Sequence, residues 1–103
     1  DVIRKRVINA RKIQEERYKQ EEGIYCNAQM NSRLLRKYAV LDEASKNLIQ
    51  NAMKKLNLSA RAYDRILKLA RTIADLDHKE NIEIQHISEA ISYRNLDKEG
   101  WAG

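Results

Sequence analysis

Proline is absent from this sequence of 103 residues, and glycine occurs only three times. Both residue types interrupt regular structure, so few positions force a helix to bend or stop. Most of the remaining chain consists of Ala, Leu, Lys, Arg, Glu and Gln, which all favour helix. The sequence therefore predicts an all-α fold.

Cysteine and long apolar runs are also scarce. The single Cys26 excludes an internal disulfide and a multi-cysteine zinc site, and it is consistent with a reducing cytoplasm. No basic neighbour supports a reactive thiol, so we expect Cys26 in a loop or partly buried. No apolar run approaches the roughly 20 residues that cross a bilayer, and no signal peptide is visible. We expect a cytoplasmic protein with no membrane partner.

The charge balance is basic, with 20 Lys and Arg against 15 Asp and Glu and a net charge of +5. Such an excess suits an anionic partner, either nucleic acid or nucleotide phosphate, and it is also compatible with a solvated helical surface. The length suits one domain, residues 1–103. The chain opens at Asp1 in the middle of a helical pattern, so we expect a piece of a longer protein.

Apolar residues recur at helical spacing in five segments, which predicts a small four- to five-helix bundle. We expect helices at 2–20, 34–41, 43–57, 60–77 and from Gln85 onward, with a polar loop at 21–32. Asp42 and Ser59 are good N-caps. Ile82 and Ile84 alternate with Glu83, which allows an extended piece of two or three residues.

The helix at 60–77 has the clearest pattern. One broad face carries Tyr63, Ile66, Leu67, Ala70, Ile73 and Ala74. The other side is expected to carry Arg61, Asp64, Arg65, Lys68, Thr72 and Asp75. The helix at 2–20 has only a thin stripe, formed by Ile3, Val7, Ala10 and Gln14 with Arg17 beside them, so we expect it to pack on one side.

No phosphate-binding loop of the form G-x-x-x-x-G-K-[ST] is present. We therefore expect that this chain alone neither holds ATP tightly nor hydrolyses it, and that it is not itself an enzyme. His78 and His86 lie eight residues apart, whereas helical metal ligands favour i, i+4. We expect surface or capping roles for both and no metal site.

Two arginines stand at the start of the helix at 60–77. Arg61 falls in its first turn, where the helix dipole mildly disfavours a cation, and Arg65 follows one turn later. Arginine can donate two parallel charge-assisted hydrogen bonds to a phosphate. The pattern fits a grip on an anion, and it also fits two ordinary solvated residues.

These segments resemble the C-terminal domain of magnesium-chelatase-like AAA+ proteins, with the bacterial ComM (competence-associated) group as the best match. Two blocks carry the resemblance most specifically: Leu-Ser-Ala-Arg at 58–61 with Arg65 and Ala-Arg-Thr-Ile-Ala-Asp-Leu at 70–76, and the final stretch 86–97. Looser matches lie upstream at Val7, Ala10-Arg11, Gln14, Arg17-Tyr18 and Asn27-Ala28.

The resemblance implies a helical lid of the AAA+ type, with Arg61 at the position of the "sensor 2" arginine. That residue would contact the γ-phosphate of ATP, in its own subunit or in a neighbour, and would be catalytic. Arg65 is a weaker candidate for phosphate contact. For Arg71 a structural salt bridge is expected, and Arg94 and Asp97 are expected to cap or bridge helices.

The same resemblance implies that the full-length protein is an ATPase using ATP and Mg²⁺. Its partners would be its own AAA+ core and neighbouring subunits, in a hexamer, with DNA as a possible substrate because the ComM group acts on DNA. Magnesium chelatase subunits instead drive metal insertion into a porphyrin, and nothing in the sequence points to that chemistry.

Two other classes stay open. One is a stand-alone basic helical module that binds nucleic acid, although no helix shows a compact basic recognition face and aromatic residues are few. The other is a histone-fold-like dimerisation domain, in which a short extended piece also precedes a final helix.

Overall fold

The computed structural model describes residues 1–98, with side chains described as far as Tyr93. Within that range the chain forms five α-helices and one 3₁₀ turn, and it contains no strand. The predicted all-α class and five helices are confirmed. The elements are α1 (Val2–Arg17), η1 (Asn27–Gln29), α2 (Ser32–Tyr38), α3 (Glu43–Leu56), α4 (Ala60–Leu76) and α5 (Ile84–Lys98).

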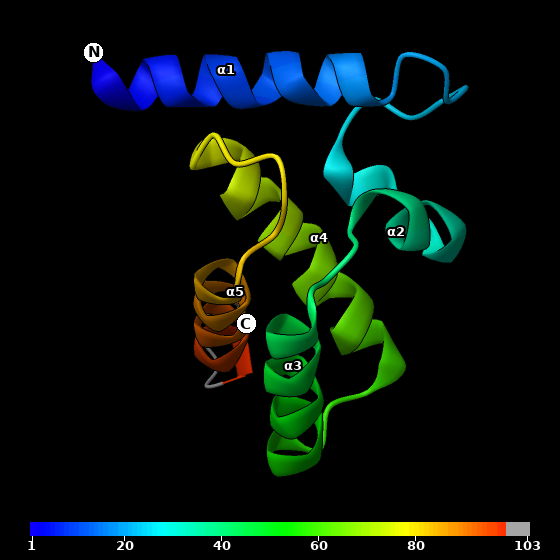
Figure 1. Cartoon of the computed structure of the whole chain (residues 1–103), viewed down its shortest axis with the longest axis vertical. Helices are drawn as coiled ribbons and strands as arrows, with labels where there is room; N and C mark the ends of the chain where they lie inside the picture. Colours follow the sequence, from blue (N-terminus) through cyan, green and yellow to red (C-terminus); the bar gives the residue numbers. More distant parts are fainter. Residues whose placement is uncertain (99–103) are drawn as a thin grey trace.

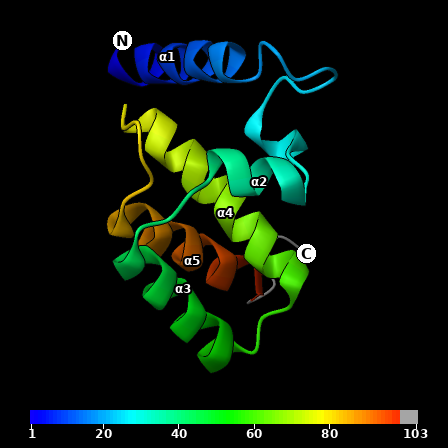
Figure 2. The ribbon, with the colours of Figure 1, turned by 45° about the vertical axis from the view of Figure 1, so that its right-hand side comes forward.

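Helix α4 is the centre of the arrangement (Figure 1). It contacts α5 most extensively and also packs against α1, η1 and α2, while α3 packs on α5. Helix α1 lies across the end of the molecule where α4 finishes, as the turned view also shows (Figure 2). The start of α4 and its end therefore face different surroundings.

Helix boundaries follow local capping chemistry. The Asp42 carboxylate accepts from the Ser45 N–H at 2.8 Å, and the Ser59 hydroxyl accepts from the Ala62 N–H at 3.2 Å. Both predicted N-caps are confirmed. Helix α3 ends at Asn57 in the left-handed conformation, which Asn tolerates better than most residues.

Two predicted boundaries were wrong. Helix α1 ends at Arg17 rather than residue 20, because the chain turns at the buried Tyr18. Helix α2 spans Ser32–Tyr38 rather than 34–41, because the Asn31 side chain accepts from the Leu34 N–H at 2.9 Å and caps the helix earlier. Ile82 is buried in a non-helical segment and Ile84 already begins α5. The expected roles of Arg94 and Asp97 fall on side chains outside the described residues.

The core lies between α2, α3, α4 and α5, and buried residues of the connecting segments such as Met30 and Leu41 complete it. The fully buried residues Ile49, Ala70, Ala74, Ile87 and Ala90 belong to it. Small alanines on α4 and on α5 allow those two helices to lie close, and the larger side chains fill the remaining space.

Helix α1 uses its apolar stripe unevenly. Ala10 is buried, but Val7 is 40% exposed and Ile3 is 75% exposed. One-sided packing is thus confirmed only for the second half of α1. No helix in the described part of the chain is long and apolar enough to cross a membrane.

Candidate functional site

The start of α4 presents two arginines to solvent. Arg61 and Arg65 are both exposed, and neither makes a hydrogen bond or an ion pair with another described residue. Their backbone is fixed, since the Ser59 cap and the apolar face of α4 hold this first turn in place. The two side chains are therefore positioned by a stable helix while their donors stay available.

Lys68 continues the same edge of the helix. Residues at i, i+4 and i+7 share one face, so Arg61, Arg65 and Lys68 form a single cationic ridge along α4. Asp64 flanks this ridge and accepts from the Ser32 hydroxyl at 3.5 Å. The ridge thus collects three cations on one side of α4.

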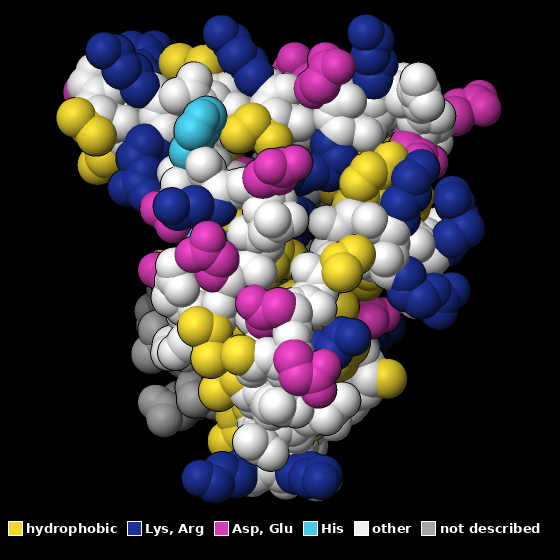
Figure 3. All heavy atoms as spheres, viewed as in Figure 1, with side chains coloured by type: hydrophobic (Ala, Val, Ile, Leu, Met, Phe, Trp, Pro, Cys, Tyr) yellow, Lys and Arg dark blue, Asp and Glu magenta, His cyan; other side chains and the backbone are white. Residues whose placement is uncertain are grey.

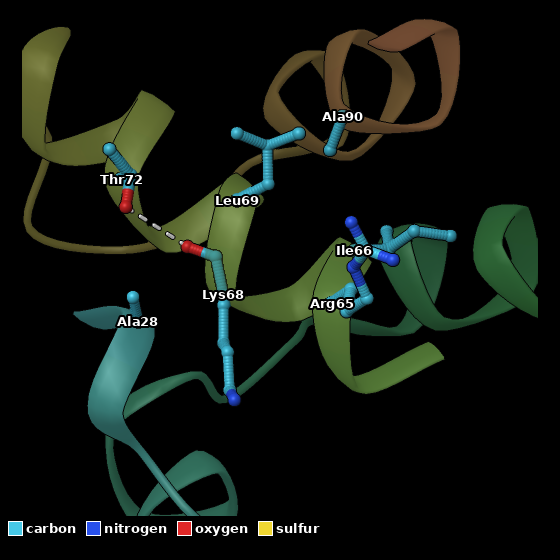
Figure 4. A pocket seen from close by; sticks show the side chains of 7 residues that line it. All are labelled: Ala28, Arg65, Ile66, Lys68, Leu69, Thr72 and Ala90. Carbon is cyan, nitrogen blue, oxygen red and sulfur yellow. Dashed lines mark hydrogen bonds between the residues drawn. The ribbon is translucent and has the colours of Figure 1, made fainter. Parts of the chain in front are cut away.

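A groove runs beside the ridge (Figure 4). Arg65 and Lys68 reach it from α4, with Ala28 of η1 and Ala90 of α5 on other sides. Its remaining lining comes from Ile66, Leu69 and Thr72 of α4. An apolar floor next to two unpaired cations suits a ligand that combines an anionic group with an apolar part.

The opposite end of α4 holds a buried ionic network around Asp75. Arg17 reaches it from α1 with Nη2–Oδ1 at 2.6 Å and Nη1–Oδ2 at 2.8 Å. Arg71 approaches the same carboxylate with Nη2–Oδ1 at 3.1 Å. The sequence pattern placed Asp75 opposite the apolar face of α4, yet it is only 1% exposed, because two guanidinium groups compensate its charge.

Arg71 is a structural residue, as the sequence predicted. It is 4% exposed and donates to the carbonyls of Lys79 and Glu80 at 3.0 Å each. Burial, and secondarily the charge of Arg17, lower the pKa of Arg71. Burial lowers the pKa of Arg17, but the hydrogen bond and the negative charge of Asp75 raise it by more. The net shift in the pKa of Arg17 is therefore upward. Neither guanidinium points to a catalytic role.

Asn27 links this network to the groove. Its Nδ2 donates to Asp75 Oδ2 at 2.9 Å and to Thr72 Oγ1 at 3.0 Å. Its Oδ1 accepts from the Tyr18 hydroxyl at 2.5 Å and from Arg17 Nη1 at 3.0 Å. Both polar atoms of the Asn27 side chain therefore have hydrogen-bond partners. These bonds anchor η1, which includes Ala28, against α4. The network therefore holds one wall of the groove.

Sequence reasoning missed the central roles of Asn27 and Asp75. The only local signal was the i, i+4 spacing of Arg71 and Asp75, which is a common ion-pair spacing in helices. Asn27 lay in a segment interpreted as a polar loop, and nothing in its neighbours indicated that it is 2% exposed.

The two histidines differ. His86 is buried, and its Nδ1 accepts from the Glu83 N–H at 2.9 Å, which caps α5 as expected. Its Nε2 then carries the proton of the neutral ring and donates to Asp77 Oδ2 at 2.9 Å. His78 is exposed. Among the described side chains no three His, Cys, Asp or Glu residues gather as a metal site would require. Cys26 lies exposed before η1.

Comparison with known proteins shows which family this chain is similar to. The family model described as magnesium chelatase, subunit ChlI, C-terminal matches residues 1–94. Over 96 residues the chain is 40% identical to the protein YifB of Salmonella typhimurium, and over 94 residues it is 39% identical to the competence protein ComM of Haemophilus influenzae. These alignments cover 93% and 91% of this chain but 18% of each relative. The resemblance inferred from the blocks at 58–76 and 86–97 is confirmed.

Proposed function

The chain belongs to the family of magnesium chelatase subunit ChlI C-terminal domains, and we propose that it is the helical lid of an AAA+ ATPase. In this proposal the domain itself does not hydrolyse ATP. It supplies Arg61 to a nucleotide held by the rest of the full-length protein. The observation that carries the proposal is the exposed, unpaired state of Arg61 on a rigidly capped helix.

The expected chemistry of Arg61 is that of a sensor arginine. A planar guanidinium can donate two parallel hydrogen bonds to a phosphate oxygen pair, and its charge offsets charge that develops in the transition state. The helix start adds a partial positive charge of its own. Arg65, one turn later on the same ridge, is a secondary candidate for phosphate contact.

The described residues fit the phosphate-binding part of a nucleotide site but not its Mg²⁺-binding part. Arg61 and Arg65 can bind phosphate, whereas the described side chains include no carboxylate cluster for Mg²⁺. We propose that the AAA+ core of the full-length protein binds ATP and Mg²⁺, and that the lid acts on that core or on a neighbouring subunit of a hexamer. The nucleotide, when bound, supplies the phosphoryl group. This chain supplies the positive charge of its arginines and holds that charge in a fixed orientation.

Two properties of the relatives and of the composition extend the proposal. The net charge of +5 and the similarity to a competence protein support DNA as the substrate of the full-length motor. The single cysteine is consistent with action in the cytoplasm.

The test is ATP turnover by the full-length protein carrying Arg61→Ala. We expect turnover to fall tenfold or more, which corresponds to about 1.4 kcal/mol in the barrier. Arg65→Ala is the matched control, since it removes the same side chain from the same ridge and should cost less. Circular dichroism and sizing confirm that fold and assembly are retained.

Two results would contradict the proposal. Unchanged turnover in Arg61→Ala would make Arg61 a surface residue. Measurable hydrolysis by the purified 103-residue chain would place catalysis inside this domain, where no phosphate-binding loop exists.

A further inference from the structure

A second hollow lies near the end of α4, between the last turns of α1 and the loop that joins α4 to α5. Its volume is about 510 Å³, and Arg17, Arg71 and Lys79 are among the residues that line it. No described residue lines both this second hollow and the groove of Figure 4. On the face shown in Figure 3, basic, acidic and histidine side chains gather where α1 crosses the end of α4. The second hollow is therefore separate from the groove beside the start of α4.

The second hollow carries more positive charge than its carboxylates neutralise. Arg17 and Arg71 share the single carboxylate of Asp75, with Nη2–Oδ1 distances of 2.6 Å and 3.1 Å. Lys79 adds another positive charge, and Glu80 is the only acidic residue among the described lining residues. Three cations thus stand against two carboxylates. After burial, the positive charge of Arg17 is a further cause of the lowered pKa of Arg71, as expected where two cations share one counter-ion.

The two arginines also have N–H groups without an acceptor in the described part of the chain. Arg71 donates through Nη1 and Nη2, whereas its buried Nε has no hydrogen-bond partner. The hydrogen bonds of Arg17 likewise all come from Nη1 and Nη2. A buried donor without an acceptor is costly. An oxyanion in the second hollow would bring acceptor oxygens and would offset the surplus positive charge.

His78, which also lines the second hollow, has a backbone conformation that favours glycine. Its φ is 58°, in the left-handed region. Its N–H donates to the carbonyl of Asp75 at 3.0 Å, and the Lys79 N–H donates to that of Ala74 at 2.9 Å. These two bonds define the Schellman motif that ends many helices, and glycine is the usual residue at this position. The end of α4 therefore does not require a histidine, but His78 places a further N–H donor beside Lys79.

We propose that the second hollow binds a phosphate group, either as inorganic phosphate or as a phosphate monoester. Arginine and lysine are the side chains best suited to phosphate, and here α1, α4 and the loop after α4 each contribute one or more of them. A carboxylate ligand fits less well, because it has one negative charge and only two acceptor oxygens. The apolar side chains of Ile13 and Val40 complete the lining and could contact the organic part of a monoester. This proposal does not depend on the role of Arg61.

The test is an NMR titration of the ¹⁵N-labelled 103-residue chain with inorganic phosphate and, separately, with glycerol 3-phosphate. Sodium chloride at matched ionic strength controls for screening. We expect saturable shifts of the Arg17 and Arg71 Nε–H signals and of the amides at 78–80, and a higher melting temperature with either phosphate than with chloride. The tighter ligand of the two identifies free phosphate or a monoester as the source of the group.

The decisive variant combines His78→Gly with Lys79→Ala. Glycine suits the backbone at 78 and Lys79 is exposed, so this variant should fold, and a dispersed spectrum verifies it. We expect its affinity for phosphate to fall by about fivefold or more. The matched control combines Asn57→Gly with Lys54→Ala, which makes the same kinds of change at the end of α3, where Asn57 also has a left-handed φ of 51°. Its affinity should equal that of the wild type.

Three results would overturn the proposal. Equal shifts with chloride would show screening alone, and saturable shifts confined to the start of α4 would place the phosphate beside Arg61. Equal affinities of the decisive variant and the wild type would show that the second hollow is not the site. Arg61→Ala distinguishes this proposal from the sensor role, because it should lower turnover by the full-length protein and leave phosphate binding to the second hollow unchanged.

Discussion

Arginine side chains occupy both ends of α4, and their surroundings differ. At the start of the helix Arg61 and Arg65 are exposed and have no partner among the described residues. At its end Arg71 is buried beside Arg17, and both bind the carboxylate of Asp75. The same residue type thus serves the fold at one end and stays available at the other.

The difference follows from the supply of negative charge. Near the end of α4, Asp75 and the carbonyls of Lys79 and Glu80 accept from guanidinium groups that burial would otherwise penalise. The start of α4 offers partial positive charge, so an arginine there gains nothing from its own helix. An external anion would compensate the positive charge that Arg61 and Arg65 place at the start of α4.

The variant Asp75→Ala tests this difference between the two ends of α4 most directly. Removing the shared carboxylate leaves the buried Arg71 and the partly buried Arg17 without their counter-ion, so we expect a loss of about 3–5 kcal/mol in unfolding free energy. Urea denaturation followed by circular dichroism measures it. Asp64→Ala, near the start of α4, should change stability by about 0.5 kcal/mol or less. A loss below about 1 kcal/mol for Asp75→Ala would mean that the network contributes little.

A smaller effect is expected at Asn27. Asn27→Ala leaves Asp75, Arg17 and the Tyr18 hydroxyl each short of one hydrogen bond, so we expect a cost of about 1–3 kcal/mol. The exposed Asn47→Ala on α3 is the control and should be near neutral. Hydrogen exchange at η1 should accelerate only in the Asn27 variant; equal exchange in both would show that other contacts anchor η1.

These two residues also show where sequence reasoning stops. The helices and the caps at Asp42 and Ser59 were predictable, because periodicity and capping depend on neighbours a few residues away. Asp75 was misplaced because a charged residue on a helix is normally solvated. Its burial depends on Arg17, 58 residues away in sequence.

The candidate site divides in the same way. The solvent-facing position of Arg61 and Arg65 was predictable from the apolar face of α4, and their role stays a prediction. The groove was not predictable, since its walls come from η1 and α5 as well as α4. No local pattern indicates that Ala28 and Ala90 lie across one hollow from Arg65.

A pH series sharpens the comparison at the end of α4. The hydrogen bond from His86 lowers the pKa of Asp77, with nearby positive charge adding to the effect. A carboxylate whose pKa is lowered by folding stabilises the fold above its ordinary pKa of about 3.9 and loses that contribution as pH falls through the lower, folded value. The melting temperature of Asp77→Asn should therefore lie below that of the wild type at pH 6, and the gap should close below about pH 4.

Glu89→Gln, an exposed change on α5, is the control for that series, and its curve should run parallel to the wild type. A gap for Asp77→Asn that stays constant from pH 6 to pH 3 would show that the His86 contact does not depend on the charge of Asp77.

The smallest expected effect is the change in the stability of the domain when the arginines at the start of α4 are replaced. Arg61→Ala and Arg65→Ala remove exposed side chains without described partners, so each should change the unfolding free energy by about 0.5 kcal/mol or less. Urea denaturation of both variants beside Asp75→Ala measures the contrast directly. A loss above about 1 kcal/mol would mean that Arg61 serves the fold, and a fall in turnover could then no longer be assigned to phosphate contact. Near-neutral stability with a tenfold loss of turnover would separate binding from folding at the two ends of one helix.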